Sequence, residues 1–155
     1  MIAAAIIFAA TKLHIVILLI AGCSLFFISS AQRIKILLTA LTALPIVFVV
    51  SRIASQLFYN PRPFVTDGVG SLFPHVADNG FPSDHALLVA TVASLVFIYN
   101  RKLGIGLFVL GLMVGIARVL AGVHHTLDIV GSFAIAIILT YLTQVLFSKF
   151  YPDNK

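Results

Sequence analysis

The sequence predicts an all-α fold, a polytopic membrane helix bundle. The composition and the pattern of apolar residues support this prediction. Of the 155 residues, 61% are hydrophobic and only 10% are charged, whereas a water-soluble domain carries about 25% charged residues. The apolar residues form long runs, which suit helices that cross a bilayer. Repeated short segments of apolar–polar alternation, typical of an outer-membrane barrel, are missing from the sequence. We therefore expect one membrane-embedded domain over residues 1–155, whose backbone polar groups are satisfied inside helices.

We expect about five transmembrane helices. The predicted spans are residues 13–30, 36–58, 84–99, 103–121 and 126–147. Residues 1–11 are apolar but too short to cross about 30 Å of hydrocarbon, so they either lie at the interface or extend the first helix. Residues 59–83 are the longest polar stretch, and their prolines and glycines predict a loop. Residues 31–35 and 100–102 are predicted to be basic loops.

The basic residues indicate an orientation rather than a nucleic-acid surface. With five spans, most of them fall on one side of the membrane: Arg33, Lys35, Arg101, Lys102, Lys149 and Lys155. The positive-inside bias assigns that side to the cytoplasm, and Lys12 is the exception outside the polar clusters described below. The positive-inside bias therefore accounts for most of the net charge of +5, and we expect no nucleic-acid partner. The loop at 59–83 and the turn at 122–125 then share the extracytoplasmic face.

The start of the third predicted span carries a polar cluster. Ser83 is a good N-cap residue, Asp84 suits the first helical turn, and His85 follows in the same turn. The free N–H groups of a helix start can bind a phosphate. A capped membrane helix with no ligand explains the same pattern.

A second cluster precedes and opens the fifth predicted span. His124 and Asp128 are four residues apart and share one helix face if that helix begins early enough. A carboxylate there would fix the imidazole tautomer and leave the other nitrogen free to attack. Arg118 lies near the end of the preceding span. The alternative is an Arg–Asp ion pair that holds two helices together.

Two more arginines lie close to the long polar loop. Arg62 stands between Pro61 and Pro63, which stiffen the backbone, and its planar fork matches phosphate oxygens. An arginine at the level of the lipid headgroups is the alternative. Arg52 lies inside the second predicted span, where a cation needs a partner or an aqueous cavity.

Together these residues resemble the three motifs of the type 2 phosphatidic acid phosphatase superfamily, over residues 13–147. The first family motif is Lys, six residues, then Arg-Pro; Arg62-Pro63 match, but Ser55 occupies the Lys position. The second is Pro-Ser-Gly-His, which here reads Pro-Ser-Asp-His at residues 82–85. The third is Ser-Arg, five residues, His, three residues, Asp; Arg118, His124 and Asp128 match, with Ala117 in the Ser position. The Asp84 variant is similar to the branch of undecaprenyl pyrophosphate phosphatases.

The resemblance implies an enzyme that hydrolyses undecaprenyl pyrophosphate to undecaprenyl phosphate at the outer face of the bacterial inner membrane. His124 would attack the phosphorus and form a phosphohistidine, Asp128 would orient it, and His85 would protonate the leaving group. The implied phosphate-binding residues are Arg62, Ser83, Arg118, Arg52 and Asp84. No metal or other cofactor is implied.

The departures from the family pattern keep other functions open. Ser55 cannot replace a cation, and Arg52, about 4.5 Å deeper on the same helix face, is the candidate replacement. Among the remaining histidines, His14, His75 and His125, we expect only His75 to touch the substrate. A monoesterase for phosphatidylglycerol phosphate, phosphatidic acid or a lipid A phosphate is one alternative function. A non-catalytic anionic-lipid binder or transporter is another. The sequence indicates neither the lipid tail nor the oligomeric state.

Overall fold

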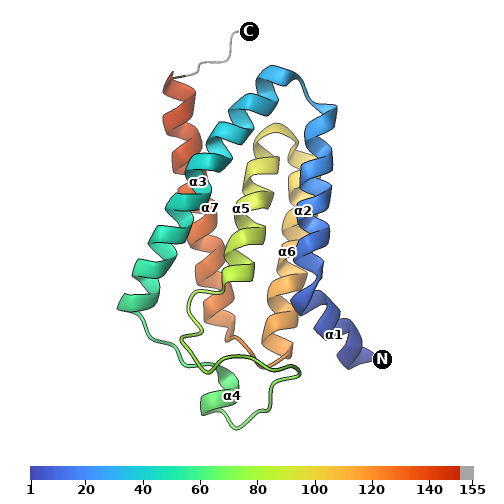
Figure 1. Ribbon diagram of the computed structural model, residues 1–155, viewed down its shortest axis with the longest axis vertical. Coiled ribbons are helices and arrows are strands. Elements are labelled where there is room, and N and C mark those ends of the chain that lie inside the picture. The colour runs from blue at the N-terminus through green and yellow to red at the C-terminus, as the bar shows by residue number, and fades with distance from the viewer. Residues whose placement is uncertain (151–155) are drawn as a thin grey trace.

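The computed structural model describes residues 1–150, and within them the helices form one bundle. The predicted all-α fold class is confirmed, because among these residues the only extended pairing is an isolated bridge between Pro61 and Asn79. The elements are α1 (Ile2–Thr11), α2 (Leu13–Ser24) with a short 3-10 turn (Leu25–Phe27), α3 (Ser30–Leu57), α4 (Pro63–Thr66), α5 (Asp84–Tyr99), α6 (Arg101–Leu120) and α7 (Thr126–Phe150) (Figure 1). Lys155 lies outside the described residues.

The structure contains membrane-spanning helices, as predicted, but their number is only close to the predicted five. Among the described residues, α3, α6 and α7 are long and apolar enough, and the bent pair of α1 and α2 would make a fourth span. α5 is apolar but has only 16 residues. Residues 1–11 form their own helix, set at 49° to the segment that follows. Membrane spans of this kind make the chain an integral membrane protein.

The predicted boundary between the first two spans is wrong. The helical part of α2 ends at Ser24, before residue 30, and α3 begins at Ser30, before residue 36. The cause is a capping box: the Ser29 hydroxyl accepts from the Gln32 N–H at 3.3 Å, and the Gln32 side chain accepts from the Ser29 N–H at 3.4 Å. Such reciprocal bonds start a helix. Residues 31–35 are therefore the first turns of α3 and not a basic loop.

α5 is the central helix of the bundle and packs against α2, α3, α6 and α7 (Figure 1). Its buried face is rich in small residues, including Ala86, Ala90 and Ala93, all without exposed surface. Small side chains allow helix backbones to approach closely, which is how helices associate where lipid removes the hydrophobic driving force. The first turn of α5 is therefore held in a fixed place among four neighbours.

The connections gather at two opposite ends of the bundle, as the five-span prediction requires. The start of α3, the α5–α6 turn and the end of α7 lie at one end, whereas α4, the long loop and the α6–α7 turn lie at the other (Figure 1). Gly122 ends α6 with a positive φ of 72°, a conformation that favours glycine. The loop predicted at residues 59–83 is interrupted by the single-turn helix α4, which begins at Pro63 as first helical turns often do.

Candidate active site

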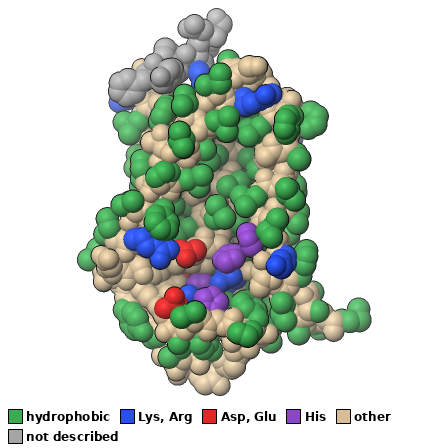
Figure 2. Space-filling model, in the orientation of Figure 1, with side chains coloured by type: hydrophobic (Ala, Val, Ile, Leu, Met, Phe, Trp, Pro, Cys, Tyr) green, Lys and Arg blue, Asp and Glu red, His purple; other side chains and the backbone are tan. Residues whose placement is uncertain are grey.

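A polar cavity of about 170 Å³ lies at the end of the bundle that carries the long loop. Figure 2 shows histidine, arginine and acidic side chains gathered in this hollow on a surface that is otherwise largely hydrophobic. The lining comes from α3, the long loop, the start of α5, α6 and the α6–α7 turn: Arg52, Ser55, Arg62, His75, Asp78, Asn79, Phe81, Pro82, Asp84, His85, Arg118 and His124. Six of the eight predicted site residues are in this set, and the other two, Ser83 and Asp128, lie directly behind it.

His124 and Asp128 form a buried pair. His124 Nδ1 lies 3.2 Å from Asp128 Oδ2, and the two side chains are 2% and 0% exposed. The condition for a shared helix face is not met, because α7 begins at Thr126, after the histidine. Instead Asp128 Oδ2 also accepts the backbone N–H of His125 at 2.8 Å. This bond folds the turn back onto the carboxylate and brings His124 within reach.

Asn60 holds the second oxygen of the same carboxylate. Its amide nitrogen donates to Asp128 Oδ1 at 2.7 Å. Gly80 makes room for this contact, since a Cβ there would lie 2.9 Å from Asp128 Oδ2 and 3.0 Å from the Asn60 carbonyl oxygen. Asp128 is thus fixed from three directions. Sequence reasoning did not include Asn60, although its place next to the Pro61-Arg62-Pro63 segment is the signal that could have indicated it.

Two buried arginines converge on the other nitrogen of His124. Arg62 Nη1 lies 3.1 Å and Arg118 Nη2 lies 3.3 Å from His124 Nε2. Because a guanidinium group only donates, Nε2 is the acceptor and the ring proton is on Nδ1, facing Asp128. His124 therefore presents a neutral, unprotonated Nε2 to the cavity.

Arg62 is held by its neighbours in a single orientation. Its Nε donates to Asp78 Oδ1 at 2.7 Å and its Nη1 donates to the Val123 carbonyl oxygen at 2.8 Å. The Asp78 partner was not predicted. Asn79, next to it, ties the loop to the end of α3 by donating to the Ser55 and Phe58 carbonyl oxygens at 2.7 and 2.9 Å. These loop residues fix the position from which Arg62 reaches the cavity.

Arg118 is 3% exposed and is reached by α1 as well as by the loop. Its Nη1 donates to the Ala10 carbonyl oxygen at 3.1 Å, and its Nη2 lies 3.2 Å from His75 Nε2. The Nε is buried without a partner, and the ion pairs found among residues 1–149 do not include Arg118. A buried cation without a carboxylate partner is costly. This geometry therefore favours an anion in the cavity.

The start of α5 differs from the expectation in one respect. Ser83 stands at the predicted N-cap position, but its side chain makes no capping hydrogen bond. The Ser83 N–H instead donates to Ser132 Oγ on α7 at 2.8 Å, and the buried Ser83 Oγ has no partner. The peptide bond before Pro82 is cis. Pro82, Asp84 and His85 line the cavity, whereas Ser83 lies behind them.

Arg52 and Asp84 form an ion pair between α3 and α5 at the rim of the cavity. Their side chains are 49% and 67% exposed. Ser55, in the position of the family lysine, also lines the cavity but is engaged by Asn79, whose amide nitrogen lies 3.1 Å from the Ser55 hydroxyl. The cation nearest to the vacant lysine position on this helix is therefore Arg52.

The other histidines have distinct surroundings. The ring of His14, on α2, meets the ring of His85 edge to face, with 4.6 Å between their centroids. His75 lines the cavity, and its contact with the substrate stays a prediction. His125 lies outside the cavity lining, against Asp67 at 3.3 Å. It points away from His124 although it is next in the chain.

The charge in the cavity is mainly positive. Arg52, Arg62 and Arg118 line it together with two acidic residues, Asp78 and Asp84. Burial lowers the pKa of His124, and the nearby Arg118 and Arg62 lower it further, although the hydrogen bond to Asp128 acts in the opposite direction. Burial likewise lowers the pKa of His75. Within the described part of the chain, no three His, Cys, Asp or Glu residues gather in a way that could hold a metal ion.

Two curated relatives share a similar segment. Undecaprenyl-diphosphatase BcrC of Bacillus subtilis (strain 168) is 37% identical over 94 residues, 61% of this chain and 49% of the relative. The bacitracin transport permease protein BcrC of Bacillus licheniformis is also 37% identical, over 58% of this chain and 45% of the relative. The chain thus spans about half the length of the curated relatives it matches.

A solved structure supports the fold. The crystal structure of Aquifex aeolicus LpxE superposes with a TM-score of 0.69 at 22% identity, covering 92% of this chain and 84% of the other. The model of the PAP2 superfamily matches residues 36–152, which contain every residue of the cavity described above. The chain belongs to the PAP2 superfamily.

Proposed function

We propose that this protein is a lipid pyrophosphate phosphatase that hydrolyses undecaprenyl pyrophosphate to undecaprenyl phosphate without a metal. The observation that carries the proposal is the convergence of two buried guanidinium groups on His124 Nε2. A terminal phosphate between them would supply the missing negative charge and would present its phosphorus to that nitrogen. The Arg118 Nε, which has no partner in the protein, would be a further donor to the phosphate.

In the first step, His124 Nε2 attacks the terminal phosphorus. A P–N bond forms, the bridging P–O bond breaks, and the lipid monophosphate leaves with a proton from His85, which lines the same cavity. Asp128 holds the Nδ1 proton and stabilises the charge that develops on the ring. Arg62 and Arg118 bind the equatorial oxygens, where charge spreads in the transition state.

In the second step, His85 takes a proton from water, whose oxygen attacks the phosphohistidine. The P–N bond breaks, inorganic phosphate forms, and His124 returns to its neutral state. The supporting feature is that both imidazoles face one cavity from two elements, the start of α5 and the α6–α7 turn. His85 can therefore donate a proton in the first half-reaction and accept one in the second, while His124 carries the phosphoryl group.

Arg52, Ser83 and Asp84 complete the proposed phosphate site in different ways. Arg52 supplies the cation that Ser55 cannot. A carboxylate repels phosphate directly, so Asp84 contributes through its ion pair with Arg52, which keeps the guanidinium at the rim. Ser83 contributes its unpartnered hydroxyl only if the start of α5 shifts when substrate binds. We expect Arg52→Ala to lower kcat/KM by about tenfold or more, and Ser55→Lys in that background to restore part of it.

The central experiment measures phosphate release by the purified protein in detergent. His124→Ala should abolish release while the thermal unfolding transition is kept. His125→Ala is the comparison variant and should keep far more activity than His124→Ala, because its side chain lies outside the cavity lining and reaches the site only through the Asn60 amide nitrogen, 3.3 Å away. Substrate labelled on the terminal phosphate and quenched early in the reaction should leave base-stable label on the wild-type protein and none on His124→Ala. Full activity of His124→Ala would end the mechanism.

The same assay addresses metal independence and the other candidate functions. Undiminished release in EDTA is the expected result. The name of the B. licheniformis relative favours a transport role as the second candidate, and absence of phosphate release from any lipid would favour that role instead. A higher kcat/KM for phosphatidylglycerol phosphate, phosphatidic acid or a lipid A phosphate than for the pyrophosphate would favour a monoesterase.

The proposed location is the bacterial inner membrane with the cavity facing outward. The support is the basic residues at the opposite end of the bundle, in the first turns of α3 and at the α5–α6 turn, which the positive-inside bias assigns to the cytoplasm. A cysteine at Val69, which is 56% exposed in the long loop, tests this in a Cys23→Ser background. An impermeant thiol reagent should label it in intact spheroplasts, and labelling only after lysis would reverse the orientation.

A further inference from the structure

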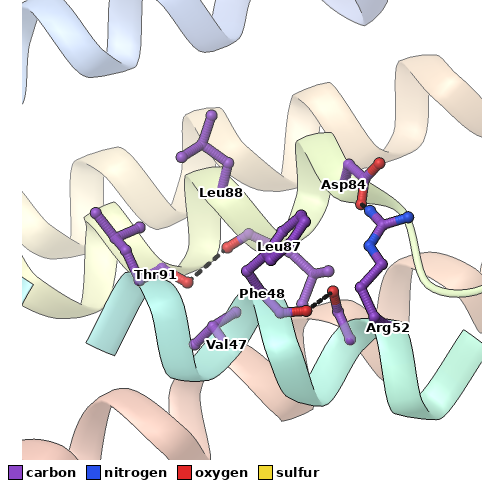
Figure 3. A pocket seen from close by; sticks show the side chains of 9 residues that line it. Val47, Phe48, Arg52, Asp84, Leu87, Leu88 and Thr91 are labelled. Carbon is purple, nitrogen blue, oxygen red and sulfur yellow. Dashed lines mark hydrogen bonds and ion pairs between the residues drawn. The ribbon is translucent and has the colours of Figure 1, made fainter. Parts of the chain in front are cut away.

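An apolar groove runs between α3 and α5 and meets the polar cavity at one end. It has a volume of about 420 Å³ and is lined by Leu44, Val47, Phe48, Ser51, Arg52, Asp84, Leu87, Leu88 and Thr91 (Figure 3). Arg52 and Asp84 line both spaces. The groove thus adjoins the site that contains His85 and His124, and the Arg52–Asp84 ion pair marks the junction.

The wall of the groove offers few free polar groups. The Ser51 hydroxyl donates to the Phe48 carbonyl oxygen at 2.7 Å, and the Thr91 hydroxyl donates to the Leu87 carbonyl oxygen at 2.8 Å, each within its own helix (Figure 3). Only the Arg52–Asp84 pair presents charge, and it does so at the junction. Beyond this pair, the groove has no free polar group to bind a headgroup, whereas a hydrocarbon chain can pack against its apolar wall along the whole length.

We propose that this groove is the binding site for the hydrocarbon chain of the substrate, next to the phosphate that stays on the lipid. The inference rests on the proposed lipid phosphatase function. From Arg52 to Leu44 the wall extends about 12 Å at the helical rise of 1.5 Å per residue, so it holds the first part of a long chain. Phe48 and Leu44 are 59% and 37% exposed on the lipid-facing surface, which lets the rest of the chain pass into the bilayer.

A chain held in the groove aligns the pyrophosphate with the cavity. Arg52 at the junction would lie beside the lipid-linked phosphate, while Arg62 and Arg118 hold the terminal one. The groove therefore favours substrates in which an apolar chain begins directly at the phosphate, as in polyprenyl pyrophosphates. Binding energy from this remote part of the substrate would be used to orient the reacting phosphorus.

The test compares two water-soluble pyrophosphate esters, dimethylallyl pyrophosphate and the longer farnesyl pyrophosphate, on the full chain in detergent. Leu88→Trp and Leu44→Trp place a large side chain in the groove near the junction and at its far end. Leu112→Trp is the control, since Leu112 is 50% exposed on α6 and lies outside the groove. All three variants replace leucine with tryptophan and so add the same bulk.

We expect each groove variant to lower kcat/KM for farnesyl pyrophosphate by roughly tenfold or more, the effect of losing the burial of about two methylene groups. The rate of Leu44→Trp on dimethylallyl pyrophosphate, and both rates of the control, should stay at the wild-type level. Leu88→Trp lies one helical turn from the junction and should lower the rate on farnesyl pyrophosphate more than the rate on dimethylallyl pyrophosphate. Equal losses on both esters, or no loss on either, would overturn the proposal. If the wild-type protein released phosphate from neither ester nor from undecaprenyl pyrophosphate, the proposed function itself would fail instead.

Discussion

Asn60 and Asp128 meet behind His124, where the Asn60 amide nitrogen lies 2.7 Å from Asp128 Oδ1. Exchanging these two residues tests how the reactive tautomer of His124 is fixed. Asp128 accepts from three donors: Asn60 on one oxygen, and the His124 ring and the His125 N–H on the other. Asp128→Asn replaces one acceptor by a donor. If the new amide group faces Asn60, two N–H donors oppose each other. If it faces His124, the ring loses its acceptor at Nδ1 and its proton moves to Nε2, against the two arginines.

The cost follows from these contacts. Leaving a buried donor unsatisfied costs about 1–3 kcal/mol, and each 1.36 kcal/mol is tenfold in rate, so one mismatch corresponds to about 5- to 150-fold. We expect Asp128→Asn to lower kcat near the upper end of this range, because the mismatch acts on the attacking nitrogen, with KM little changed. Steady-state phosphate release measures both constants, and thermal unfolding reports the stability of each variant.

The reversed pair supplies the decisive comparison. In Asn60→Asp with Asp128→Asn, the carboxylate at 60 accepts from the new amide, whose oxygen again accepts from His124. Asn60→Asp alone places two carboxylates against each other and should also lose activity. We expect the double variant to be at least about tenfold faster than Asp128→Asn. A double variant no faster than that single variant would refute the reasoning.

Two further results are expected. Gly80→Ala should lower kcat because its Cβ would lie 2.9 Å from a carboxylate oxygen of Asp128, whereas Gly70→Ala, with nothing within 4 Å, should keep the wild-type rate. Since attack requires neutral His124 and burial lowers its pKa below the ordinary value of about 6.5, the acid limb of the kcat/KM profile should lie below that value. An acid limb centred above pH 7 would contradict this.

The sequence identified most of the cavity because its chemistry is carried by charged groups in apolar surroundings. Arg118 and His124 stand out by that contrast, and so does Arg62 between its prolines. The loop partners Asn60, Asp78 and Asn79 did not stand out, because polar residues are expected in any exposed loop. Only the folded loop shows that they hold the ends of Arg62 and Asp128 in place.

The errors at helix boundaries have a similar origin. Hydropathy assigned residues 31–35 to a loop because they include Arg33 and Lys35, yet the bonds between Ser29 and Gln32 start the helix there. At the start of α5, Ser83 stands at the N-cap position as predicted, but its hydroxyl makes no capping hydrogen bond, and its own N–H donates to Ser132 on another helix. A tertiary contact of this kind leaves no local pattern.

Two of the three departures from the family motifs, Ser55 and Asp84, form one feature. A serine in place of the motif lysine removes a cation from α3, and an aspartate in place of the motif glycine adds an anion at the start of α5. In the structure Asp84 pairs with Arg52, three residues before Ser55 on the same helix. The added anion thus holds a deeper arginine at the cavity rim, beside the apolar groove that arginine also lines. Under the proposed function, this places the cation beside the lipid-linked phosphate of a pyrophosphate, a position that a monophosphate substrate would not occupy.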